Sequence, residues 1–213
     1  MGPDRTPSGT RPVAVLLSGR GSNFLALQAA IDRGEIPARI VLVLSNVEGA
    51  QGLERARQLG LATACLPHGD FSRRVEHDAA VVSALQEAGA EWVCLAGYMR
   101  LLGSGFVGAF RERILNIHPS LLPAFSGLDA QQQALDYGVA VSGCTVHLVD
   151  EELDHGPIVV QRPVPVEPGD TEGSLAERIL HEEHRAYPEA LRRLLAERWR
   201  IEGRRVVFDS PGD

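Results

Sequence analysis

From Val13 onward, short apolar runs alternate with stretches in which apolar residues recur at helical spacing, and this alternation limits the possible folds more than any other feature. The apolar runs are short enough for buried strands, which we expect at 13–17, 40–44, 62–66 and 92–96. The intervals between them predict helices at 22–33, 51–59 and 72–88. Because such strands bury both faces, the pattern predicts an α/β fold with a mostly parallel central sheet and helices on both of its faces.

The pattern changes after an expected strand at 114–117. The next segment is His118-Pro119-Ser120-Leu121-Leu122-Pro123, a loop whose prolines restrain the backbone at both ends. Beyond it the sequence predicts a short helix at 129–137, strands at 143–149 and 158–166, a helical stretch at 171–198 that Pro188 interrupts, and a hairpin at 199–208. Because no repeat or linker is evident, we expect a single domain at 13–208, a flexible N-terminal tail at 1–12 and a C-terminal tail at 209–213.

The composition argues against several classes of protein. Lys and Arg number 21 against 28 Asp and Glu, so the net charge of -7 repels nucleic-acid phosphates and anionic lipid. No apolar run approaches the roughly 18 residues that a membrane span needs. The cysteines at 65, 94 and 144 are far apart, odd in number and set in apolar stretches, which indicates reduced, buried thiols. We therefore expect a soluble cytoplasmic protein that binds neither nucleic acid nor a membrane.

The first candidate site is the loop Ser18-Gly19-Arg20-Gly21-Ser22-Asn23, which follows an expected strand and opens an expected helix. Its glycines let the backbone approach an anion, and the helix N-terminus offers free N–H groups and a partial positive charge. The loop lacks the third glycine of a dinucleotide fingerprint and the Gly-Lys-Ser/Thr of a P-loop. Phosphate binding is one interpretation, and a glycine-rich turn with Ser22 as a helix cap is the other.

The second candidate is Asn116-Ile117-His118, at the end of an expected strand. Strand alternation places the amide and the imidazole on one face, with Ile117 on the other. Strand ends of this kind are where open α/β sheets bind ligands. An amide N–H and a protonated imidazole can both donate to the oxyanion of an acyl transfer, although a structural histidine would fit the same position.

The third candidate is the acidic turn Glu151-Glu152-Leu153-Asp154-His155-Gly156-Pro157. Most of its carboxylates are expected to be solvated, as is Asp150 before it. Asp154 precedes a bend, where it could keep a nearby histidine protonated by raising the pKa of its ring. The residues alone do not bring Asp154 to His118, which lies 36 positions earlier.

Two further patterns limit the chemistry. His181-Glu182-Glu183-His184 resembles a metal pair on one helix face but lacks the His-Glu-x-x-His spacing of a zinc protease, so we expect no metal. A glutamate of this helix could instead accept a hydrogen bond from a ligand amine. Because the chain has neither a Gly-x-Ser-x-Gly elbow nor a cysteine in an activated context, direct transfer is favoured over a covalent acyl-enzyme.

Over 13–208 the chain resembles the phosphoribosylglycinamide formyltransferase family, which transfers formyl from 10-formyltetrahydrofolate to the amine of glycinamide ribonucleotide without a metal. Four motifs in the family's order carry the resemblance: Ser18-Gly-Arg-Gly-Ser-Asn23, Leu95-Ala-Gly-Tyr-Met-Arg-Leu-Leu102, Leu115-Asn-Ile-His-Pro-Ser-Leu-Leu-Pro123 and Glu152-Leu-Asp-His-Gly-Pro157. It implies a Rossmann-like formyltransferase fold, with those two compounds as the substrates. Whether the protein is a monomer or a homodimer stays open.

The resemblance also implies roles for individual residues. Asn116, His118 and Asp154 match the catalytic trio. The positions that bind glycinamide ribonucleotide in the family are matched by Gly19, Arg20, Gly21, Ser22, Asn23, Arg74 and Glu183. By this resemblance the loop and Arg74 would contact the phosphate, and Glu183 would contact the amine. The pterin wall matches Met99, Arg100, Leu101, Leu102, Asn116, Val149 and Asp150, and the loop continues to Asp154. Backbone groups of that wall would read the ring.

Three positions depart from the family pattern, namely Leu180, Ser126 and Asp129, and they bear on substrate details. A formyltetrahydrofolate deformylase would carry an extra N-terminal domain and another residue in place of Pro119. A methionyl-tRNA formyltransferase would need an added C-terminal domain and a basic face. A non-catalytic nucleotide-binding protein would use the phosphate loop without needing Asn116, His118 and Asp154 together.

Overall fold

The computed structural model describes residues 9–209, and within that range a single nine-stranded sheet runs in the order β3-β2-β1-β4-β5-β6-β7-β9-β8. The strands of its first half are all parallel: β1 (Arg11–Leu17), β2 (Ala38–Ser45), β3 (Thr63–Cys65), β4 (Trp92–Leu95) and β5 (Ile114–His118). The predicted α/β fold with a mostly parallel sheet is therefore confirmed.

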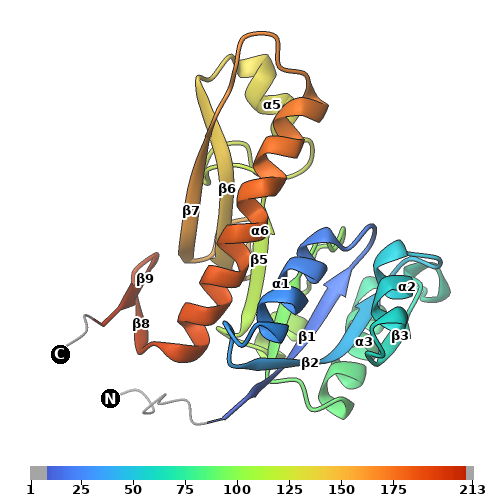
Figure 1. Cartoon of the computed structure of the whole chain (residues 1–213). Coiled ribbons are helices and arrows are strands. Elements are labelled where there is room, and N and C mark those ends of the chain that lie inside the picture. Colours follow the sequence, from blue (N-terminus) through green and yellow to red (C-terminus); the bar gives the residue numbers. More distant parts are fainter. Residues whose placement is uncertain (1–8, 210–213) are drawn as a thin grey trace.

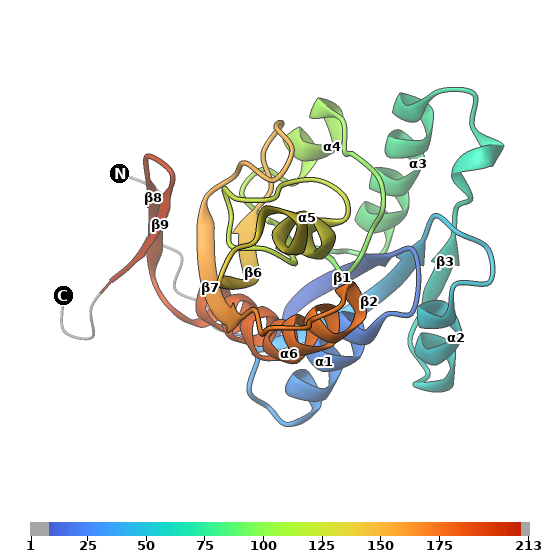
Figure 2. The ribbon, with the colours of Figure 1, turned by 90° about the horizontal axis from the view of Figure 1, so that it is seen from above.

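Helices cover both faces of this half (Figures 1 and 2). They are α1 (Ser22–Asp32), α2 (Gln51–Gln58), α3 (Arg74–Glu87) and α4 (Ser104–Ala109). The fully buried residues of β1 alternate between the faces: Val13, Val15 and Leu17 pack in one core cluster with α1 and α2, and Ala14 and Leu16 in another with α3 and α4. A strand that buries both faces reads as a continuous apolar run, which is why the sequence predicted this half closely.

The second half of the sheet is mostly antiparallel. β6 (Val141–Leu148) pairs antiparallel with β5 and with β7 (Ile158–Pro165), after the short helix α5 (Ala130–Tyr137). The long helix α6 (Glu172–Ala196) packs against α1, β6 and β7, and the hairpin of β8 (Trp199–Glu202) and β9 (Arg205–Phe208) closes the sheet edge. In Figure 1, β6, β7, α5 and the first turns of α6 rise above the rest of the fold.

Three expectations are corrected. β1 begins at Arg11, inside the predicted N-terminal tail, because Arg11 pairs with Ala38 and bridges to Glu91. α4 was not predicted, since its six residues, SGFVGA, include two weak helix formers. α6 continues through Pro188 because buried side chains on both sides of that proline hold the two halves on the sheet. Residues 1–8 and 210–213 of the predicted tails lie outside the described part.

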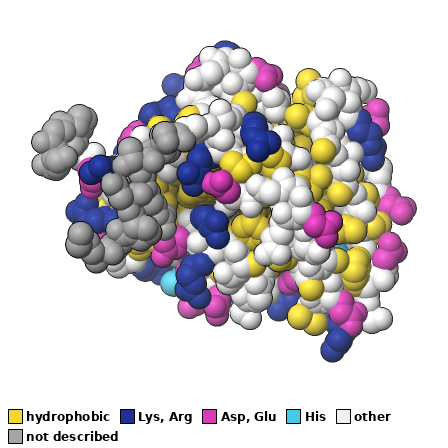
Figure 3. Space-filling model, turned by 90° about the horizontal axis from the view of Figure 1, so that it is seen from below, with side chains coloured by type: hydrophobic (Ala, Val, Ile, Leu, Met, Phe, Trp, Pro, Cys, Tyr) yellow, Lys and Arg dark blue, Asp and Glu magenta, His cyan; other side chains and the backbone are white. Residues whose placement is uncertain are grey.

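The face of the described residues that is seen from below mixes the two signs of charge. On the face seen from below, basic and acidic side chains are interspersed, so the described part of this face shows no continuous basic area (Figure 3). Within residues 9–209, no helix is both long and apolar enough to cross a membrane.

Candidate active site

The strand order places a ligand crevice at the carboxyl end of β1. The chain builds β1, β2 and β3 outward and then crosses back to place β4 on the other side of β1. The loops that leave β1 and β4 therefore diverge to opposite faces and open a crevice between them, as in other open α/β sheets. The two candidate loops, 18–23 and 97–102, leave these two strand ends.

The glycine-rich loop is held in a shape that only glycine adopts easily. Gly21 has a φ of 73°, and a Cβ there would lie 2.8 Å from Cα of Gly52. The Gly52 N–H donates to the Gly19 carbonyl at 2.9 Å, which fixes the loop on α2. Gly21 occupies the N-cap position and Ser22 is the first helical residue, so the alternative of Ser22 as a helix cap is wrong. No side chain caps α1, which leaves its first N–H groups facing the crevice.

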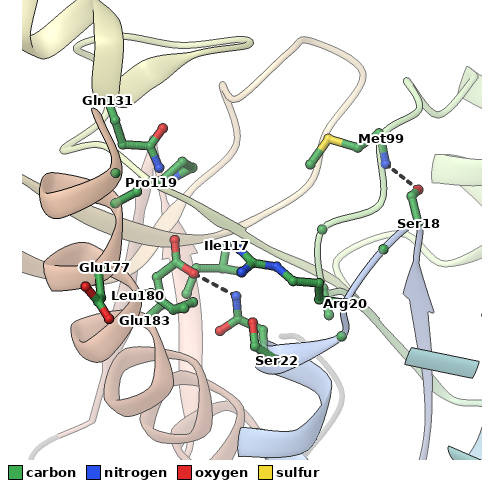
Figure 4. Close-up of a pocket in the computed structure, with 17 residues that line it drawn as sticks. Ser18, Arg20, Ser22, Met99, Ile117, Pro119, Gln131, Glu177, Leu180 and Glu183 are labelled. Carbon is green, nitrogen blue, oxygen red and sulfur yellow. Dashed lines mark hydrogen bonds between the residues drawn. The ribbon is translucent and has the colours of Figure 1, made fainter. Parts of the chain in front are cut away.

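A cavity of about 770 Å³ opens over this loop. Its far wall is α6, which contributes Glu177, Leu180 and Glu183 (Figure 4). Arg20 extends into it and is the sole basic side chain among the described residues that line it. We call this cavity the first cavity. It has a cation and free helix N–H groups on one wall and carboxylates on the other.

Glu183 is a buried carboxylate on that far wall. It is 8% exposed and accepts a hydrogen bond from Asn23 Nδ2 at 2.7 Å. Burial raises the pKa of Glu183, and the Asn23 hydrogen bond opposes that rise only in part. Oδ1 of Asn23 is buried without a protein partner in the described residues, so the pair retains acceptor capacity beside the cavity.

The structure brings together the three residues of the expected trio. Asn116 and His118 share one face of β5, as strand alternation predicted, and pair across the ladder with His147 and Thr145 of β6. His118 Nδ1 lies 3.4 Å from Asp154 Oδ2, with both side chains more than nine-tenths buried. β6 runs antiparallel to β5 and ends at Leu148, opposite Leu115, and the acidic turn that follows folds back and brings Asp154 to His118.

Both carboxylate and ring are fixed by the backbone. The Gly127 N–H donates to Asp154 Oδ2 at 2.8 Å, and His118 Nε2 donates to the Phe125 carbonyl at 2.8 Å. The two ring nitrogens of His118 thus face a carbonyl oxygen and a carboxylate, and an imidazolium offers an N–H to each.

His147 is a site residue that the sequence interpretation missed. Its Nδ1 lies 3.0 Å from the Leu148 carbonyl and is therefore the donor, which leaves Nε2 to accept from Asn116 Nδ2 at 3.1 Å. Burial lowers the pKa of His147, which keeps the ring neutral as this arrangement requires. The one available signal was a histidine inside the otherwise apolar run of β6.

A second cavity of about 410 Å³ lies on the other side of the end of β5. Most of the expected pterin wall lines it, namely Arg100, Leu101, Leu102, Asn116, Val149 and Asp150, together with His147 and Asp154. Met99 departs from this set, because it lines the first cavity and its N–H donates to Ser18 Oγ. Arg74 also lines the second cavity and is not among the residues around the glycine-rich loop.

The family model described as "Formyl transferase" matches residues 11–191. The chain belongs to the formyl transferase family. The resemblance drawn from the four motifs is thereby confirmed, and the match covers both cavities and the trio between them.

Several named relatives are close in sequence. A phosphoribosylglycinamide formyltransferase from Escherichia coli (strain K12) is 41% identical over 198 residues, covering 93% of this chain and 91% of that protein. The trifunctional purine biosynthetic protein adenosine-3 of Drosophila pseudoobscura pseudoobscura is 51% identical over 181 residues. The chain spans 13% of the length of that protein.

Two solved structures illustrate the shared fold. Glycinamide ribonucleotide transformylase 1 from Symbiobacterium toebii is 50% identical in sequence and superposes with a TM-score of 0.92. The match covers 93% of this chain and 94% of that one. A formyltetrahydrofolate deformylase from Pseudomonas syringae is 26% identical with a TM-score of 0.87. This chain matches 67% of that deformylase.

Other expected features can be located as well. Leu180 faces the first cavity, and Asp129 takes the N-cap position of α5 with a φ of 56°. Within the described residues, no group of three or more His, Cys, Asp or Glu side chains is placed to hold a metal ion. All three cysteines are free thiols; Cys94 and Cys144 are buried, which raises the pKa of each to about 12, and Cys65 is half-buried.

Proposed function

We propose that this chain transfers a formyl group from 10-formyltetrahydrofolate to the amine of glycinamide ribonucleotide. The observation that carries the proposal is the end of β5, where Ile117 and Pro119 line the first cavity while Asn116 lines the second. A reaction between two bound substrates needs its polar groups at such a boundary. The names of the full-length relatives support the same activity.

The first cavity suits the ribonucleotide. Its phosphate would take the N–H groups of residues 19–23 at the start of α1, with the Arg20 guanidinium supplying the positive charge. Glu183 would accept hydrogen bonds from the glycinamide amine. Leu180 offers no polar group to the phosphoribosyl part, which leaves charge neutralisation to Arg20.

The second cavity suits the folate. Arg100, Leu101, Leu102, Val149 and Asp150 would form the wall around the pterin, with their backbone groups as hydrogen-bonding partners. The position of Arg74 changes its expected role. Since Arg74 and Arg100 line the same cavity, we assign both to the anionic glutamate end of the folate instead of giving Arg74 to the phosphate.

The trio would act on the bond that forms between the two substrates. The neutral amine attacks the formyl carbon, a C–N bond forms, and the carbonyl electron pair moves to the oxygen. Two groups would donate hydrogen bonds to that oxyanion: Asn116 Nδ2 and the His118 Nε2–H. In the structure the His118 Nε2–H donates to the Phe125 carbonyl, and it would exchange this acceptor for the oxyanion. Asp154 stabilises the charged ring and takes the proton that the amine loses. That proton passes to the folate nitrogen, the oxyanion re-forms the carbonyl, and the C–N bond to the folate breaks.

Turnover with both substrates tests this proposal. Tetrahydrofolate should form only when glycinamide ribonucleotide is present, in a one-to-one ratio with the formylated product. Release of formate without the ribonucleotide would instead identify a deformylase. Binding of the ribonucleotide without any turnover would indicate a non-catalytic nucleotide-binding protein.

A further inference from the structure

The Ser18 hydroxyl joins the ends of three neighbouring strands. Ser18 follows β1, and its Oγ donates to Asn46 Oδ1, after β2, at 2.6 Å. The same oxygen accepts from the Met99 N–H, beyond β4, at 2.8 Å (Figure 4). A serine hydroxyl has one proton and two lone pairs, so the bond to Asn46 fixes the proton and aims a lone pair at Met99. Asn46 is 2% exposed, which limits movement of this acceptor.

This hydroxyl lies between two segments that serve different cavities. Ser18 is the first residue of the glycine-rich loop of the first cavity. Met99 leads directly into Arg100, Leu101 and Leu102, which line the second. Because segment 96–103 has no helix or strand of its own, its position depends on individual bonds of this kind.

The same segment has a second attachment that does not involve the glycine-rich loop. At its far end, the Gly103 N–H donates to Oδ2 of Asp78, a buried residue of α3, at 2.9 Å. The segment is thus held at one end by Ser18, whose N–H also donates to the Gly97 carbonyl at 3.0 Å, and at the other end by Asp78. Only the Ser18 attachment moves with the loop expected to hold the phosphate.

We propose that Ser18 is a positioning residue that couples the two substrate cavities. A phosphate bound by the glycine-rich loop orders Ser18, which orders Met99 and the wall of the second cavity, so either ligand tightens binding of the other. The coupling is reciprocal by thermodynamic necessity. This inference rests on the proposed function, because that function supplies the two ligands.

Binding measurements test the coupling without turnover. Titration calorimetry would give the Kd of tetrahydrofolate with and without saturating glycinamide ribonucleotide, a pair that cannot react. In the wild type we expect the ribonucleotide to tighten folate binding by at least about fivefold. Ser18→Ala should lower this ratio at least twofold, because it removes the hydroxyl bond to Met99 and leaves only the backbone bond to Gly97. Asn46→Ala should lower it too, by freeing the hydroxyl proton.

Two matched variants separate coupling from simple loosening. Asp78→Ala removes the other attachment, so it should weaken folate binding but keep the wild-type ratio. Ser45→Ala removes a buried hydroxyl whose hydrogen bonds, among the described residues, are with the Val47 carbonyl and N–H. It should change neither the Kd of the folate nor the ratio. In turnover, Ser18→Ala should raise the KM for the folate with kcat within about twofold of wild type, because Ser18 touches no reacting atom.

Independent binding of the two ligands to the wild type would overturn the inference and leave the proposed function intact. A wild-type ratio retained in both Ser18→Ala and Asn46→Ala would also overturn it. If neither ligand bound the wild type, the proposed function would fail together with the coupling.

Discussion

Replacing Asp154 by asparagine tests the charge of the trio with little change of shape. Oδ2 of Asp154 both accepts from the Gly127 N–H and faces His118. In Asp154→Asn the amide oxygen must take that position, because the Gly127 N–H needs an acceptor. The variant therefore keeps an oxygen 3.4 Å from the ring and removes the negative charge, together with the ability of this side chain to take up a proton.

The size of the effect follows from that distance. Two unit charges 3.4 Å apart at an effective dielectric constant of about 20 attract each other by about 5 kcal/mol. If the full attraction supported the transition state, its loss would slow turnover by a few thousand-fold, roughly one decade per 1.4 kcal/mol. We expect a fall in kcat of about a hundredfold to a thousandfold, since the amide dipole replaces part of the interaction.

The assay is the rate of tetrahydrofolate release with both substrates saturating, alongside the Kd of each substrate. Glu152→Gln is the matched control, because that carboxylate lies in the same turn but its side chain is 75% exposed. It should keep nearly full activity. The reasoning would be refuted if Asp154→Asn kept more than about a tenth of wild-type turnover with unchanged Kd values.

Three other substitutions give separate tests. Glu183→Gln should raise the KM for the ribonucleotide. Because burial raises the pKa of Glu183 in the fold, the wild type loses stability as the pH rises from the pKa of the unfolded chain to that of the folded protein. Glutamine has no such loss, so the Tm of the variant relative to wild type should increase from acidic to neutral pH. His147→Phe should cost about 1–3 kcal/mol in kcat/KM by leaving Asn116 without its acceptor. Gly21→Ala should lower the free energy of unfolding by about 1–3 kcal/mol in urea titrations, whereas Gly19→Ala, where a Cβ meets nothing within 4 Å, should not.

The first half of the fold was readable from local patterns. Strands such as β1 bury both faces and are therefore continuous apolar runs, and Gly60 and Gly89 mark helix ends with positive φ. Local rules failed where tertiary packing overrides them. Pro188 breaks the helical pattern in sequence but not in space, because Tyr187 and Leu191 on either side are fully buried.

The candidate site was readable in part. The period of a strand put Asn116 and His118 on one face from sequence alone. No local rule reaches Asp154, whose approach to His118 depends on the antiparallel return of β6 and on an Asp154 φ of 51°. His147 was missed for the same reason, since its partner Asn116 lies 31 positions away in a register that only the sheet defines.

The position of Arg74 shows why residue type and family position together still do not assign a ligand. An arginine in this family predicts an anion, and both proposed substrates are anions, one through a phosphate and one through carboxylates. The choice between them depends on which side of the end of β5 the side chain reaches. Arg74 begins α3, on the sheet face opposite α1 and α6, whereas the first cavity lies between α1 and α6. The same face places Arg74 beside Arg100, and under the proposed assignment Arg20 is the one basic side chain in the described lining that neutralises the phosphate.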